Sequence, residues 1–191
     1  MSSISNPKFS RRSFVMGGAA LPLLAACGGN GVNSRAAQRL DQRVDAALDF
    51  MYQEVPGSEE LAFNAAGMLV MPLITEAGFG FGGSYGRGAL RIGSATVDYY
   101  SAIAGTFGLQ IGAQQYAHTL FFMTEVALRE FRESAGWAIG ADVRYAVIND
   151  GGTLGLDTNT LLDPVIALVY GQAGLIVGAT LDGTRYSRII P

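Results

Sequence analysis

Cysteine, histidine and lysine are almost missing from this 191-residue chain, which holds one cysteine and one histidine and whose only lysine is Lys8. A single cysteine excludes an intramolecular disulfide bond, and one histidine beside it leaves no cluster of ligands for a structural zinc ion. We therefore expect neither a metal nor a cofactor. The shortage of lysine also argues against nucleic-acid binding, because the neutralisation of phosphates dominates that binding.

A long apolar run is missing too, since no stretch reaches the 18 or so unbroken apolar residues of a membrane-spanning helix. The run from Val15 to Ala26 is shorter and follows Ser10-Arg11-Arg12-Ser13, a twin-arginine pattern. It ends in Leu24-Ala25-Ala26-Cys27, which is similar to a bacterial lipobox. We expect residues 1–26 to be a signal peptide of the twin-arginine type.

Cys27 is the predicted lipidation site. In a lipobox protein the thiol takes a diacylglycerol, and the amine freed by cleavage takes a further acyl chain such as palmitate. Two or more acyl chains hold a protein stably at a membrane. Gly28 rather than aspartate follows the cysteine, which favours the outer membrane, and we expect the periplasmic face. The alternatives are an ordinary secretory signal with a chance cysteine, and export by the general secretory route.

Cleavage before Cys27 removes Lys8, Arg11 and Arg12 but no acid, so the net charge falls from −3 to −6. Residues 27–34 are then the lipidated cysteine and a flexible glycine-rich tether, and residues 35–191 form a single domain.

The domain is expected to begin with an amphipathic helix that Ser34 caps and that runs to about Tyr52. At roughly 100° per residue, arginine and aspartate form two separate stripes beside its apolar face. The stripes are Arg35, Arg39 and Arg43 on one flank and Asp41, Asp45 and Asp49 on the other. In one interpretation both flanks are solvated. In the other, the arginine stripe, a few residues from the acylated cysteine, binds anionic lipid headgroups.

Glycine recurs at every second position between Ala77 and Gln115, beginning with Gly78, Gly80 and Gly82. A period of two suits a strand and not a helix. Because glycine weakens a strand, a bare glycine face requires tight coiling of the sheet or the close approach of another element. We expect an α+β domain in which a strongly curved antiparallel sheet, tending to a barrel, carries a few helices.

The other predicted helices are a short one from Ser58 to Ala65 and one from Thr124 to Glu133. Strands are predicted over residues 67–74, 96–104, 106–115, 165–170, 173–181 and 184–190, with a turn near Ile92-Gly93-Ser94 and a hairpin across Asp182-Gly183 that joins the last two. Between them lie a short apolar run over 118–123, an alternating segment over 137–147 and a polar loop over 149–163.

Several spaced motifs resemble the SYLF domain family. They are Gly67-Met68-Leu69-Val70, the run from Ala77 to Gly83 with Gly86-Arg87-Gly88, Gly108 to Gln114, and Gly174 to Ala179 before Asp182-Gly183. The resemblance extends from about Leu40 to Ile190. Members are lipid-binding modules without known enzymatic activity; eukaryotic ones bind phosphoinositides through a basic amphipathic N-terminal segment, and yeast relatives bind actin. The resemblance therefore implies that Arg35, Arg39 and Arg43 contact headgroups.

Three other motifs indicate alternative chemistry. Gly82 to Gly86 fits the G-x-S-x-G of a nucleophile elbow, and Ser84, Asp98 and His118 fall in hydrolase order, but no helix is expected after the serine. A G-x-G-x-x-G match at Gly78 lacks the helix that would receive a pyrophosphate. In the polar loop, Asp150, Asp157, Asn159 and Asp163 have the oxygen ligands of a cation site, although a solvated loop is the simpler reading.

The sequence thus predicts a non-enzymatic lipid-binding module of a membrane-anchored bacterial lipoprotein, with anionic phospholipid as the partner. Two alternatives remain: a structural or protein-interaction lipoprotein of the envelope, and, more remotely, a serine hydrolase that uses Ser84. The aromatic residues Phe79, Phe81, Phe107 and Trp137 are predicted to lie in the core, with an aromatic-lined lipid cavity as the alternative.

Overall fold

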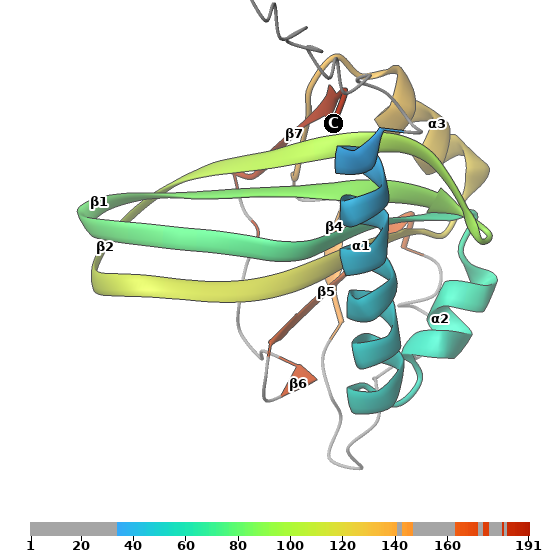
Figure 1. The fold of residues 1–191 in the computed structure, drawn as a ribbon, viewed down its shortest axis with the longest axis horizontal. Helices are drawn as coiled ribbons and strands as arrows, with labels where there is room; N and C mark the ends of the chain where they lie inside the picture. Colours follow the sequence, from blue (N-terminus) through green and yellow to red (C-terminus); the bar gives the residue numbers. More distant parts are fainter. Residues whose placement is uncertain (1–33, 141–142, 147–162, 172–173, 176–180, 182) are drawn as a thin grey trace, which may run out of the picture.

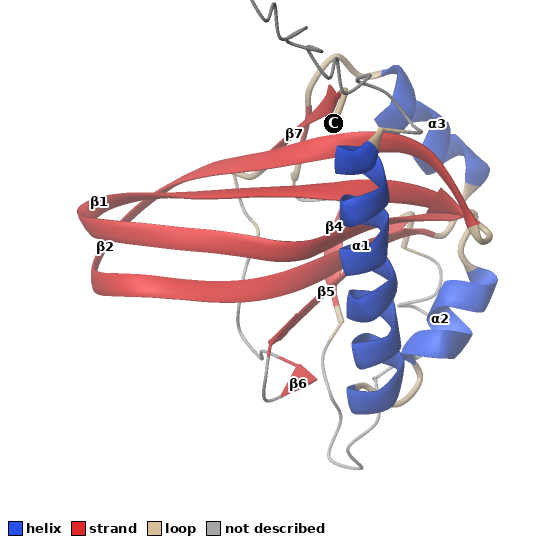
Figure 2. Cartoon of the chain, viewed as in Figure 1, coloured by secondary structure: helices blue, strands red, loops and turns tan. Residues whose placement is uncertain are grey.

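The computed structural model describes residues 34–140, 143–146, 163–171, 174–175, 181 and 183–191. Over these residues the chain forms a curled sheet with helices packed against it (Figures 1 and 2). The expected α+β class with a curved sheet is confirmed. The elements are α1 (Arg35–Glu54), α2 (Ser58–Asn64), β1 (Gly67–Ile92), β2 (Ala95–Phe122), α3 (Glu125–Glu133), β3 (Trp137–Ala138), β4 (Val143–Tyr145), β5 (Val165–Gly171), β6 (Gly174–Leu175) and β7 (Arg185–Ile189).

The sheet is built on one very long hairpin, in which β1 and β2 pair antiparallel from Gly67–Phe122 to Ile92–Ala95. Its turn lies at Gly93 and Ser94 as expected, and Gly93 has a φ of 58°, which favours glycine. The expectation of separate strands on each side of this turn is wrong. The strands bend at register shifts, such as that between Phe79 and Gly80, instead of ending.

Bending brings the two ends of β2 to different partners. Near its start, Tyr99–Ile103 pair with β7, whereas Ala117–Phe122 near its end pair with β5. The resulting seven-stranded sheet has the order β3-β7-β2-β5-β4, with β1 on β2 and β6 on β5. The sheet was expected to be antiparallel throughout, but β4 pairs with β5 in parallel, starting at Val143–Val165. The predicted alternating segment 137–147 contains both β3 and β4, and these two short strands lie at opposite ends of the strand order.

The bare glycine face in β1 is explained by close packing of the strand against its own first half. A Cβ atom on Gly88 would collide with the carbonyl oxygen of Val70, and one on Gly86 would lie 2.6 Å from the carbonyl oxygen of Leu73. Any side chain at these two positions would keep the halves of the folded hairpin apart. Of the two expected reasons for bare glycine, the tight coiling of the sheet applies at Gly86 and Gly88, since the atoms that approach them belong to β1 itself.

Both faces of the sheet are covered by apolar clusters. On one face α1 and α2 pack with Met68, Val70, Phe121 and Ile166, and on the other α3 packs with Leu69, Phe122 and Val165. Alternate residues of the same strand enter different clusters, as the pleat requires. Burial of an apolar side chain stabilises the fold by about 1.5–3 kcal/mol, so each helix is fixed mainly by its apolar stripe.

The helices begin and end close to the expected residues. The Ser34 side chain accepts a hydrogen bond from the Ala37 N–H at 2.9 Å, and the Thr124 side chain caps α3 in the same way. No helix of the described part is long and apolar enough to cross a membrane. The predicted strand 173–181 lies largely outside the described residues, so its hairpin with β7 stays a prediction.

Candidate functional site

The acidic flank of α1 holds the helix on the sheet. Asp41 accepts hydrogen bonds from the Thr96 and Tyr99 hydroxyl groups, each at 2.8 Å, and Asp45 pairs with Arg91 at 2.6 Å. Burial and the Asp41 carboxylate raise the pKa of Tyr99 to about 12, so its hydroxyl stays a donor at neutral pH. The expectation of a solvated acidic flank is therefore wrong for Asp41, which is half-buried, whereas Asp45 is exposed and still forms an ion pair. Nothing in the sequence marked Arg91, Thr96 and Tyr99 as their partners.

The basic flank of α1 faces away from these contacts. Arg35, Arg39 and Arg43 are exposed, and within the described residues none of them forms an ion pair. They recur every four residues, hence about 6 Å apart along the helix. The start of this flank is anchored, because the Ser34 hydroxyl donates to the Pro191 carbonyl oxygen at 3.3 Å. The helix thus presents a fixed row of cations to solvent.

The lipidation and export residues cannot be placed beside this flank. Cys27, Arg11 and Arg12 lie outside the described residues, and their assignments stay predictions. The same applies to Asp150, Asp157 and Asn159 of the expected polar loop. Asp163, the remaining oxygen donor of that group, pairs with Arg144 at 2.6 Å. Across the described part of the chain, no three histidine, cysteine, aspartate or glutamate side chains gather in a way that could hold a metal ion.

The candidate catalytic residues are not brought together as a triad. Asp98 lies between Arg132 at 3.2 Å and Arg188 at 3.4 Å, so its carboxylate serves two guanidinium groups. Ser84 is buried within β1, and the chain continues as a strand after it, so the elbow has no helix. The G-x-G-x-x-G match at Gly78 lies in the same strand and likewise opens no helix.

His118 cannot act as the base in this arrangement. Its Nε2 atom shares a hydrogen bond of 2.7 Å with the Tyr186 hydroxyl, and its Nδ1 atom is buried without a hydrogen-bond partner. Neither nitrogen is therefore bonded to Asp98 or to Ser84. Burial lowers the pKa of His118 to about 3, which keeps the ring neutral inside the core. The histidine is a packed core residue.

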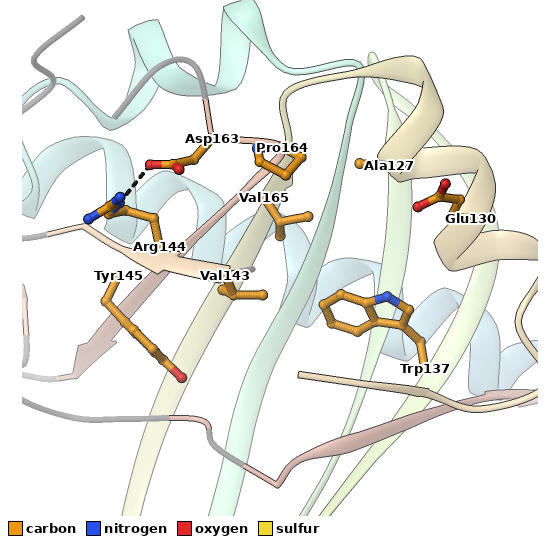
Figure 3. Close-up of a pocket in the computed structure, with 9 residues that line it drawn as sticks. All are labelled: Ala127, Glu130, Trp137, Val143, Arg144, Tyr145, Asp163, Pro164 and Val165. Atoms are coloured by element: carbon orange, nitrogen blue, oxygen red, sulfur yellow. Dashed lines mark hydrogen bonds and ion pairs between the residues drawn. The ribbon is translucent and has the colours of Figure 1, made fainter. Parts of the chain in front are cut away.

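One open pocket of about 630 Å³ lies between α3, β3, β4 and the start of β5 (Figure 3). Trp137, Val143 and Val165 form its apolar wall, and the Arg144–Asp163 ion pair crosses its rim. Trp137 is partly buried and packs edge-on against the core residues Phe122 and Phe131, so its expected place in the core is met on one side of the ring only. Because Asp163 already engages the Arg144 guanidinium, the pocket is no ready-made site for an anion.

Comparison with known families supports a binding role. Residues 103–188 match the family model Ysc84, which is described as Las17-binding protein actin regulator. No curated protein matches the chain. The match spans the second part of β2 through most of β7, and it excludes α1, to which the resemblance noted above extends. Over residues 103–188 the chain is therefore similar to the Ysc84 family, and this match contains two of the glycine motifs, Gly108 to Gln114 and Gly174 to Ala179, on which the SYLF resemblance rests.

Proposed function

We propose that this protein is a non-enzymatic lipid-binding module of a membrane-anchored bacterial envelope lipoprotein. Its basic α1 flank, which consists of Arg35, Arg39 and Arg43, contacts the headgroups of anionic phospholipid. Acylated Cys27 anchors it to the outer membrane, on the periplasmic face. The family match supports the general part of the proposal, a non-enzymatic binding role, since SYLF domains are related to lipid or actin binding and are in general not enzymes.

The observation that supports the proposal most strongly is that the two charged flanks of α1 have different surroundings. The acidic flank is used to dock the helix, whereas the basic flank keeps three exposed guanidinium groups without ion pairs among the described residues. An arginine near a negatively charged membrane surface contributes about 1 kcal/mol. Three of them on a rigid helix supply useful attraction even in a chain whose net charge is negative, because screening confines the effect to groups near the surface.

Vesicle co-sedimentation of the chain from residue 28 onward, which contains every described element and lacks the acyl anchor, tests the proposal. We expect salt-sensitive binding to vesicles that contain phosphatidylglycerol and none to phosphatidylcholine alone. Arg39→Gln should weaken binding, and changing Arg35, Arg39 and Arg43 together to glutamine should abolish it. Arg129→Gln is the matched control, because Arg129 is exposed on α3 and its loss changes the net charge equally. Absence of binding at low salt would refute the proposal.

A protein-interaction lipoprotein is the second candidate. The name of the matched family, Las17-binding protein actin regulator, refers to a protein, Las17, as a binding partner. If the unacylated chain ignores vesicles while cross-linking in intact cells joins the acylated protein to a specific envelope protein, this second function is the correct one.

A further inference from the structure

The helix α1 covers only part of one sheet face. Ala89 and Tyr99 belong to the apolar cluster that contains the α1 residues Leu40 and Val44, and Ile189 packs against it. Ala89, Tyr99 and Ile189 lie opposite one another on β1, β2 and β7 and so form one row on that face.

Two further rows continue the same face beyond the helix, since side chains two positions apart on a strand share a face. The nearer row is Arg87, Ser101 and Ser187, and the farther row is Tyr85, Ile103 and Arg185. Tyr85 is 53% exposed and Ile103 is 55% exposed, although they are paired directly across the hairpin. An aromatic and an aliphatic side chain are thus neighbours in solvent and form a small apolar patch. A single exposed apolar residue would need no explanation, but an adjacent pair does.

The two flanks of α1 show on which side these rows lie. Asp41 and Asp45 reach Arg91 and Thr96, next to the turn of the hairpin, so the acidic flank faces the turn. The basic flank is on the other side of the helix, away from the turn, with Arg43 next to the sheet and Arg35 pointing away from it. Figure 1 shows this crossing, with the turn on one side of α1 and the long body of the hairpin on the other.

The arginines of the domain divide in the same way. Arg91, Arg132, Arg144 and Arg188 are held in ion pairs with aspartates. Those of the basic flank, together with Arg87 and Arg185 on the uncovered rows, are exposed and form no ion pair with any described residue. Arg129 on α3 is exposed and unpaired in the same sense, but it stands alone there. The two uncovered rows contain no carboxylate. Among the described residues, the uncovered sheet face and the basic flank of α1 therefore carry positive charge that no carboxylate neutralises.

We propose that the basic flank and the rows Arg87–Ser101–Ser187 and Tyr85–Ile103–Arg185 form one surface that lies flat on an anionic bilayer. Tyr85 and Ile103 enter the headgroup region, where an amphipathic aromatic ring and an apolar side chain are favoured, and Arg87 and Arg185 contact phosphates beside them. This inference rests on the proposed function and extends its site from the helix to the sheet. The chain between Cys27 and α1 reaches roughly 25 Å at full extension, so the anchor holds this surface close to the membrane.

The test compares two apolar positions of similar exposure. In vesicle co-sedimentation with phosphatidylglycerol, Tyr85→Ser with Ile103→Ser should weaken binding about tenfold, because binding scales with the apolar area buried. Val126→Ser on α3, where Val126 is 51% exposed, should leave the affinity unchanged. Equal unfolding midpoints in urea for both variants and the wild type would show that the fold is intact.

Insertion is measured directly by tryptophan fluorescence. Tyr85→Trp should be quenched by brominated lipids in phosphatidylglycerol vesicles, and Val126→Trp should not be. If the wild type binds and the triple arginine variant does not, yet Tyr85→Ser with Ile103→Ser binds normally and Tyr85→Trp is not quenched, the inference is overturned while the proposed function stands. If the wild type itself does not bind these vesicles, both are overturned. The inference is also overturned if Tyr85→Ser with Ile103→Ser binds vesicles normally but no longer cross-links to an envelope protein that the wild type contacts.

Discussion

His118 gives this fold a pH-dependent stability that a single residue controls. Its pKa is lowered to about 3 from the ordinary 6.5, so between these values the unfolded chain binds a proton that the folded chain does not. Stability is therefore complete above pH 6.5 and falls as the pH drops towards 3. Between pH 7.5 and pH 5 we expect the free energy of unfolding to decrease by about 2 kcal/mol through this residue. Urea denaturation at the two pH values measures the change.

The control for this effect is His118→Gln, which keeps a polar group opposite the Tyr186 hydroxyl but cannot titrate. The variant should be less stable at pH 7.5, yet it should lose about 2 kcal/mol less than the wild type between the two pH values. No other histidine is present in the chain to mimic the effect. The same pH dependence in both proteins would place its origin elsewhere.

Gly88 is the residue that makes the folded hairpin possible. Gly88→Ala should destabilise the protein by about 1–3 kcal/mol, because the new Cβ atom must push away the Val70 carbonyl and the Met71 sulfur. Gly105→Ala is the matched control on the facing strand, since a Cβ atom there meets nothing within 4 Å. Urea unfolding should show little change for the control, and equal losses for the two variants would contradict the close-packing explanation.

At the scale of elements, the docking of α1 depends on Asp41 more than on Asp45. Asp41→Ala leaves the Tyr99 hydroxyl, in a residue only 2% exposed, without its acceptor, and we expect a loss of about 1–3 kcal/mol. Asp45→Ala removes an ion pair from a side chain that is 60% exposed and should cost less than about 1 kcal/mol. Thermal unfolding of both variants tests the order, which equal losses or a reversed order would disprove.

Elements with local signals could be predicted from the sequence, and elements defined by distant contacts could not. Ser34 and Thr124 predict the starts of their helices because capping is a local interaction. Glycine at every second position predicts strands in the same way. The merging of strands into the long hairpin depends on whether the chain bends or breaks near Phe79, which only packing of the two halves decides. The parallel pairing of β4 with β5 also has no local signal.

The candidate site shows the same limit. The arginine stripe of α1 follows from helical periodicity alone, and the structure leaves it exposed. The docking role of Asp41 and Asp45 was missed because their partner Arg91 is distant in the chain, 46 residues away from Asp45. Tyr85, Ile103 and Arg185 come together only through strand register, so no spacing in the sequence could have joined them into one surface.

At the scale of the whole molecule, the chain is acidic, with a net charge of −3, although one of its surfaces is basic. The carboxylates that neutralise arginines are those of Asp45 by the hairpin turn, Asp98 on β2 and Asp163 just before β5. None of them pairs with an arginine of the basic flank. Such a molecule is repelled by an anionic membrane in most orientations and attracted in one. The predicted acyl anchor at Cys27 complements this property, because it keeps the protein close enough for the favourable orientation to be found.

Fractionation of cells that produce Cys27→Ser tests that anchor. We expect the wild type in the outer-membrane fraction, with an acyl mass on its N-terminal peptide, and the variant in the soluble envelope fraction or unprocessed, because serine lacks the thiol that takes the diacylglycerol. Arg11→Lys with Arg12→Lys keeps the charge and removes the guanidinium pair, so it should block export only if the twin-arginine route is used. Normal export of the lysine pair would indicate the general secretory route, and an unacylated wild type would exclude the lipid anchor itself.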